Sequence, residues 1–122
     1  YVDDDQDLQV AMRVVLEQGG YIVKEASTAE QGLRVYKECG PDLVIVDLMM
    51  EEIDAGARLA KELMAVGNKA PVYMLSSMGD NLNAATSYSD LGLAGIFQKP
   101  IMPDKLLKIL DAKLRKPASS AK

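Results

Sequence analysis

Apolar and polar residues follow two different spacings along this chain, and the spacings predict the order of its elements. Runs of consecutive or alternating apolar residues are typical of β-strands, whereas apolar residues that recur every three or four positions are typical of amphipathic helices. On this basis we expect strands at residues 21–26, 43–47, 71–75 and 95–98. Helices are expected between and after them, at about residues 5–18, 27–39, 57–66, 82–91 and 103–116.

Residues at the predicted borders support this division of the chain. Tyr1 and Val2 look like the end of a first strand whose beginning is missing from the numbered chain. Asp5 is expected to start the first helix, because acidic residues suit the helix N-terminus. Ser27 and Glu30 have the spacing of a capping box, which would open the second helix at Ser27.

Strands that alternate with helices predict an α/β fold, a doubly wound (βα)5 sandwich with a five-stranded parallel sheet and right-handed crossovers. The chain has 122 residues, of which 48% are hydrophobic, and this suits one domain with a sizeable core. We expect that domain over residues 1–116, followed at 117–122 by a polar tail or the start of a linker.

Composition excludes several classes of function. The net charge of −4 argues against direct nucleic-acid binding, and no apolar run approaches the roughly 20 residues needed to span a bilayer. Cys39 is the only cysteine and there is no histidine, so a disulfide, a typical zinc site and a Ser-His-Asp triad are excluded within the chain. A soluble cytoplasmic protein is expected, whose chemistry relies on carboxylate, hydroxyl and lysine groups.

Asp47 is a charged residue at the end of the most apolar predicted strand. The four preceding residues are apolar, three of them β-branched, as in a strand buried on both faces of a parallel sheet. Ligands of open α/β sheets bind beyond the carboxyl ends of the strands, where Asp47 lies. Position alone is equally compatible with a carboxylate that caps the following loop.

Other polar residues follow the remaining predicted strands and should share the same edge of the sheet. They are Asp3, Asp4, Asp47, Ser76, Ser77 and Lys99. Three neighbouring carboxylates repel one another unless a cation lies between them, and an all-oxygen cluster suits a hard ion such as Mg²⁺. With such an ion Asp47 could attack phosphorus as a nucleophile, while Lys99 and Ser76 stabilise the phosphoryl oxygens.

These strand-end residues resemble those of the receiver domains of two-component response regulators, which have the fold of the chemotaxis regulators. The resemblance rests on four segments that together span nearly the whole chain, at residues 2–5, 41–50, 71–77 and 99–100. It implies a flavodoxin-like sheet with strand order 2-1-3-4-5.

The resemblance also implies roles for individual residues at the predicted sheet edge. Asp47 would accept a phosphoryl group from a partner histidine kinase or histidine phosphotransfer protein. Asp4 and Asp47 would bind Mg²⁺ directly, Asp3 through water, and Met49 through its backbone carbonyl. Lys99 would pair with the phosphoryl group.

Signal output would depend on a switch at the surface of strand 4, helix 4, strand 5 and helix 5. Ser76 stands at the switch hydroxyl, and Ile96 stands where an aromatic residue is common. Glu51 and Ala55 replace a usual proline and a usual glycine, so the loop after Asp47 could follow a different path. The resemblance implies an effector domain or target protein of unknown identity, and a homodimer through the helix 4, strand 5 and helix 5 face is an open alternative.

Two other functions remain as alternatives. A haloacid-dehalogenase-like phosphohydrolase also uses an Asp nucleophile and Mg²⁺, but it needs a second carboxylate two residues later, where this chain has Met49. A non-phosphorylated pseudo-receiver would act only as a binding module. The resemblance to receiver domains implies a protein that is not a conventional enzyme, although it assists its own phosphorylation and slow dephosphorylation.

Overall fold

The computed structural model describes residues 1–47, 55–76, 93–98 and 102–114. Four helices and three strands lie within these residues, at positions that largely agree with the spacing of apolar residues. The elements are α1 (Gln6–Gln18), α2 (Ala29–Cys39), β1 (Val44–Asp47), α3 (Ala55–Ala65), β2 (Val72–Ser76), β3 (Gly95–Gln98) and α5 (Pro103–Leu114). The helix expected at 82–91 lies outside the described residues.

The three strands form one parallel sheet in the order β1-β2-β3. Asp47 is in register with Leu75, and Ser76 is in register with Gln98. Val2 forms a parallel bridge to Ala26 on one side and to Val46 of β1 on the other. This placement agrees with the expected position of the first two strands, but each is present as a single bridge, and the full five-strand order is not shown.

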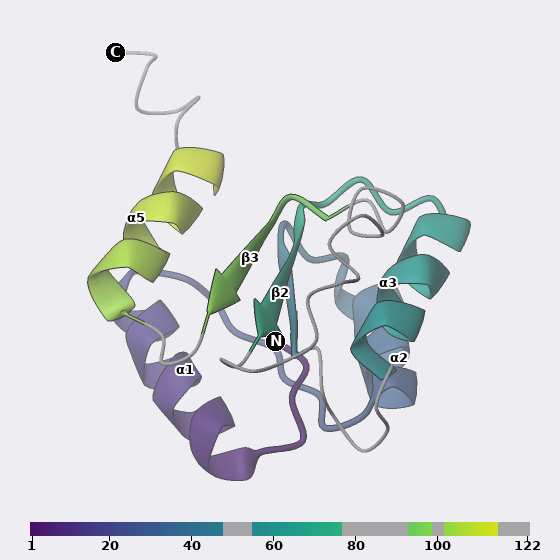
Figure 1. Ribbon diagram of the computed structural model, residues 1–122, viewed down its shortest axis with the longest axis horizontal. Coiled ribbons are helices and arrows are strands. Elements are labelled where there is room, and N and C mark those ends of the chain that lie inside the picture. The colour runs from purple at the N-terminus through teal and green to yellow at the C-terminus, as the bar shows by residue number, and fades with distance from the viewer. Residues whose placement is uncertain (48–54, 77–92, 99–101, 115–122) are drawn as a thin grey trace.

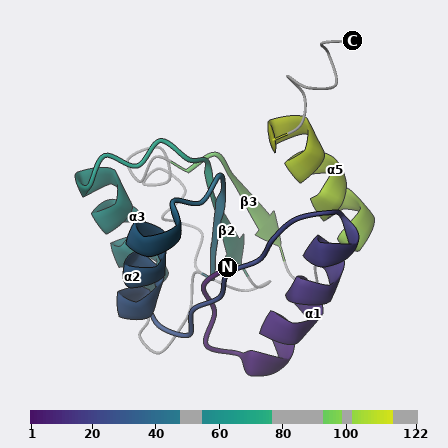
Figure 2. The same cartoon turned by 180° about the vertical axis from the view of Figure 1, so that it is seen from behind.

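Helices cover both faces of the sheet, with α1 and α5 on one side and α2 and α3 on the other (Figures 1 and 2). The strand side chains alternate between the two sides and therefore build two buried clusters. The α2 and α3 side buries Val2, Ala26, Ala29, Val44, Val46, Leu59, Leu63 and Val72. The α1 and α5 side buries Met12, Leu16, Ile45, Tyr73, Leu75, Leu106 and Leu110.

The predicted helix borders are largely confirmed. Asp5 is the N-cap of α1 and accepts a hydrogen bond from the backbone N–H of Leu8 at 3.1 Å. The end of α2 at Cys39 is also confirmed, because Gly40 adopts the left-handed conformation with φ of 57° that often follows a helix.

The expected capping box at Ser27 is wrong by one residue. Thr28 is the N-cap of α2, and its hydroxyl accepts from the N–H of Gln31 at 3.0 Å. The Gln31 side chain accepts in turn from the N–H of Ser27 at 2.9 Å. Starting the helix at Ala29 buries that alanine against the core, which the pattern of polar residues could not show.

The strand expected at residues 21–26 is not present as a strand, since only Ala26 forms a bridge there. Ile22 is 91% exposed, whereas its neighbours Tyr21 and Val23 pack against the cluster on the α1 and α5 side. Met64 of α3 is exposed as well. Among the described helices, none has the length and apolar character required to cross a bilayer.

Candidate functional site

Buried polar side chains mark one end of the sheet. Among the described residues they are Asp3, Gln9, Asp47 and Ser76, which are 0%, 9%, 4% and 1% exposed. Asp47 and Ser76 end the neighbouring strands β1 and β2, and Asp3 follows the Val2 bridge beside β1. Burying a carboxylate is costly unless other groups compensate it, so these residues define the candidate site.

Asp3, Asp4 and Asp47 form an acidic cluster, the name used for these three residues below. One carboxylate oxygen of each lies within 4.8 Å of the others. Backbone hydrogen bonds bring the two segments together, because the N–H of Asp47 donates to the carbonyl of Val2 at 2.9 Å. Asp4 is exposed, whereas the other two are buried. The predicted closeness of these carboxylates is therefore confirmed.

Two donors fix the carboxylate of Asp3. The phenol of Tyr1 donates to Oδ2, and the backbone N–H of Asp5 donates to Oδ1 at 2.9 Å. Burial, followed by the hydrogen bond to Asp3, raises the pKa of Tyr1 far above its ordinary value of 10.0, and the negative charges of Asp3, Asp47 and Asp5 act in the same direction. The phenol therefore stays protonated at neutral pH and acts as a donor.

Gln9 is a site residue that the sequence analysis missed. Its side-chain amide donates to the backbone carbonyls of Asp3 and Ala26, the latter at 2.9 Å. It thereby ties α1 to the Asp3 segment and to Ala26, the bridge partner of Val2. A signal was present in the sequence, because Gln9 lies three residues before Met12 and seven before Leu16, on the buried face of the helix.

The remaining predicted site residues are only partly described. Ser76 is buried at the end of β2, and Ile96 of β3 is 37% exposed. Ile96 is in register with Met74, two residues before Ser76, so these three residues face the same side of the sheet. Lys99 and Met49 lie outside the described residues, as does Glu51.

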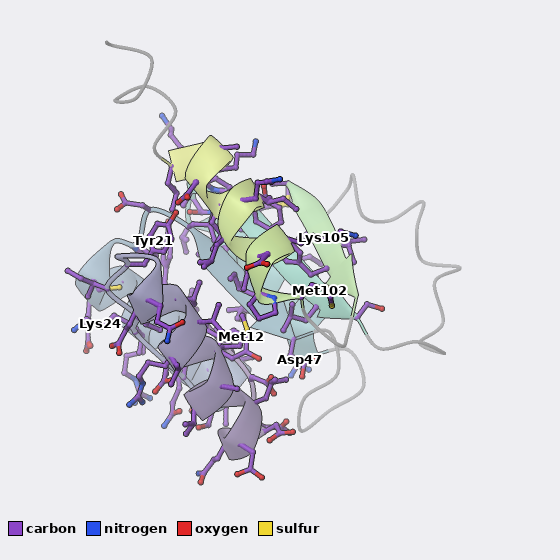
Figure 3. The ribbon with its side chains drawn as sticks, turned by 90° about the vertical axis from the view of Figure 1, so that its left-hand side faces the viewer. Met12, Tyr21, Lys24, Asp47, Met102 and Lys105 are labelled. Atoms are coloured by element: carbon purple, nitrogen blue, oxygen red, sulfur yellow. The ribbon has the colours of Figure 1, made fainter. Side chains whose placement is uncertain are left out.

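Asp47 lies at the end of the sheet away from Tyr21 (Figure 3). A hollow of about 420 Å³ lies elsewhere, lined among others by Tyr21, Lys24, Leu43 and Leu110. None of the acidic cluster lines this hollow. The buried carboxylates therefore identify the candidate site, and the position of this hollow does not.

The acidic cluster fits a hard divalent cation. Its donors are all carboxylate oxygens, which are the ligands that Mg²⁺ prefers, and their spacing leaves them in mutual repulsion when no cation is present. Asp3 and Asp47 are buried, so water screens their charges less than it screens Asp4. A cation bound among the three would remove that repulsion.

Comparisons with known proteins identify the family. Residues 1–111 match the response regulator receiver domain family. The chain is 30% identical over 114 residues to the chemotaxis protein CheY of Bacillus subtilis, and the match covers 93% of both chains. It is 34% identical over 117 residues to the transcriptional regulatory protein GlrR of Escherichia coli, covering 96% of this chain and 26% of GlrR.

A solved structure supports the same assignment. The crystal structure of the receiver domain of NtrX from Brucella abortus matches with a TM-score of 0.83 and 26% identity, covering 94% of this chain and 96% of that one. The chain spans about a quarter to a half of the length of the first transcriptional regulators that it matches. The coverage of residues 1–111 and the fold together show that this chain belongs to the response regulator receiver domain family of two-component signalling.

Proposed function

We propose that Asp47 is the phosphoacceptor of this receiver domain. The observation that carries the proposal is the burial of Asp47 at the carboxyl end of β1, within 4.8 Å of two further carboxylates. The chain has no histidine, so a phosphohistidine would come from a partner histidine kinase or histidine phosphotransfer protein. Receiver domains work with histidine kinases and effector domains, which agrees with this source.

The transfer step needs only the phosphohistidine and a proton from solvent, and the later hydrolysis needs water. A carboxylate oxygen of Asp47 forms a bond to phosphorus while the P–N bond of the phosphohistidine breaks. The electron pair of that bond stays on the imidazole nitrogen, which takes up a proton. The product on this chain is an acyl phosphate, and its hydrolysis returns the carboxylate of Asp47.

The proposal assigns a bound Mg²⁺ to the acidic cluster. Asp4 and Asp47 would bind it directly, and the backbone carbonyl of Met49 would be a further ligand. Asp3 already accepts a hydrogen bond at each oxygen, which suits its proposed contact through water. When bound, Mg²⁺ would offset the negative charge of the phosphoryl oxygens.

Two further residues complete the proposed site. Lys99 directly follows the last residue of β3, and we assign it to the phosphoryl oxygens as a counter-charge. Ser76 would donate a hydrogen bond to a phosphoryl oxygen. Because Ile96 faces the same side of the sheet and is partly exposed, a movement of Ser76 could reach the surface through Ile96.

A phosphodonor experiment tests the assignment of Asp47. The protein is incubated with acetyl phosphate and Mg²⁺, and the intact mass is measured. Wild-type protein should gain one phosphoryl group, and Asp47→Asn should gain none. Asp42→Asn is the matched control, because Asp42 is an exposed carboxylate just before β1, and it should be labelled like wild type. Full labelling of Asp47→Asn would refute the assignment.

The remaining assignments are also proposals. We place the receiver domain at residues 1–116, with 117–122 as a tail or linker. The receiver family acts in signalling, and we propose that this chain turns over no substrate beyond its own phosphoryl group. The kinase, the effector and a homodimer through β3 and α5 are open to test in the full-length protein, and a cytoplasmic location stays a prediction.

A further inference from the structure

We propose that Tyr1 is a positioning residue for the acidic cluster, and that its phenol sets the Mg²⁺ affinity of the site by holding the carboxylate of Asp3. This inference rests on the proposed function of the cluster. Tyr1 donates to Oδ2 of Asp3, while the N–H of Asp5 donates to Oδ1. Two donors on opposite oxygens fix the plane in which the carboxylate lies.

The hydrogen bonds on Asp3 leave its remaining acceptor sites available. An ionised carboxylate offers about four acceptor positions on its two oxygens, and Tyr1 and Asp5 use one on each. A cation, or a water molecule bound to it, can therefore approach Asp3 without displacing the phenol. Tyr1 acts on the site by orienting Asp3.

Packing holds Tyr1 in place for this role. Tyr1 and Asp3 are two residues apart in an extended segment, so their side chains point to the same side. The carbonyl of Tyr1 accepts from the N–H of Ala26 at 3.1 Å, and the N–H of Val2 donates to the carbonyl of Ile45 at 2.8 Å. The ring of Tyr1 packs against the buried cluster under α1 and α5. Its phenol is thus directed at Asp3 by the fold.

Tyr21 is a matched phenol that does not contact the acidic cluster. Its ring packs against the same buried cluster, and its phenol also donates to a carboxylate, that of Asp111 in α5. It lies at the far end of this layer from Asp47 (Figure 3). Tyr21→Phe therefore removes the same chemical group from the same core without touching the acidic cluster.

The experiment measures Mg²⁺ binding to wild type, Tyr1→Phe and Tyr21→Phe by isothermal titration calorimetry. Loss of a residue that orients a direct metal ligand typically weakens metal binding about 10–100-fold, and because Asp3 is proposed to act through water we expect the lower end, about tenfold, for Tyr1→Phe. Tyr21→Phe should bind Mg²⁺ like wild type. Circular dichroism melts in EDTA check that both variants are folded.

A second readout uses wild-type protein alone. With ¹³C-labelled tyrosine, the ring resonances of Tyr1 should shift during the Mg²⁺ titration, while those of Tyr21 should stay in place. Wild-type affinity for Tyr1→Phe would overturn the inference, and tighter binding would do so by showing that the phenol competes with the metal. If wild type itself binds no Mg²⁺, the proposed metal site fails, and this result is distinct from a failure of Tyr1 alone.

Discussion

Replacing Asp47 with asparagine should stabilise the protein when no Mg²⁺ is present. The carboxylate oxygens of Asp3 and Asp47 lie within 4.8 Å of each other, and both residues are buried. At this separation two unit charges repel by about 1 kcal/mol in water and by about 3.5 kcal/mol at an effective dielectric constant of about 20. The asparagine removes one charge while keeping the size of the side chain.

Relief of this repulsion should raise the free energy of unfolding by about 1–3 kcal/mol. The gain is smaller than the full repulsion because the asparagine loses some of the hydrogen bonds that a carboxylate accepts. For a chain of this size, a gain of about 2 kcal/mol corresponds to a rise in Tm of about 6–10 °C. Mg²⁺ should reduce this difference. At a concentration 100-fold above Kd, a ligand that binds only the folded state adds about 2.7 kcal/mol, and the variant should gain less.

Urea unfolding followed by circular dichroism, once in EDTA and once in Mg²⁺, measures both effects. Asp7→Asn is the control, since Asp7 is exposed in the first turn of α1, outside the acidic cluster. It should lose a little stability under both conditions, because an acidic group there favours the helix dipole. A less stable Asp47→Asn in EDTA would refute the repulsion argument, and equal stabilisation by Mg²⁺ would refute Asp47 as a ligand.

Three further predictions concern the fold around the site. Leu106 is fully buried on the inner face of α5, so Leu106→Ala should lower the free energy of unfolding by about 2–5 kcal/mol. Urea unfolding should show this as a lower midpoint with an unchanged slope. Gly40 ends α2 at φ of 57° with open space around it, so Gly40→Ala should cost about 1–2 kcal/mol by backbone strain, and Gly40→Asn less, in the same assay. The raised pKa of Tyr1 keeps its phenol neutral in the folded state, while the unfolded chain ionises near 10.0. The contribution of the Tyr1 phenol to the free energy of unfolding should therefore be intact at lower pH and lost as the pH rises above 10.0. In urea unfolding, stability should fall less at alkaline pH for Tyr1→Phe than for wild type, and equal falls would contradict this.

Much of the fold and part of the site could be predicted from local patterns. The apolar run that ends at Asp47 became the fully buried strand β1, because four consecutive apolar residues suit a strand covered on both faces. The closeness of Asp3, Asp4 and Asp47 followed from topology, since the carboxyl ends of parallel strands meet at one edge. The chemical roles of these residues stay predictions.

Local patterns failed where a residue's environment is set by distant parts of the chain. Residues 21–26 have a strand-like composition, yet Ala26 alone among them forms a bridge, Lys24 adds one backbone contact to Tyr1, and Ile22 lies in solvent. The N-cap of α2 is Thr28 instead of Ser27, and the helix that begins at Ala29 places that alanine in the core. Propensity ranks such alternatives only weakly, and tertiary packing chooses between them.

By itself, the sequence determined the order of most described elements and the acidic residues at the sheet edge, because periodicity and strand ends are local features of the sequence. Only the tertiary structure decided what holds those residues. Tyr1 is hydrogen-bonded to Asp3, and Gln9 donates both to Asp3 and to Ala26, which lies 17 residues after Gln9. Such side-chain contacts depend on the packing of a helix against strand ends, which no local spacing of residues specifies.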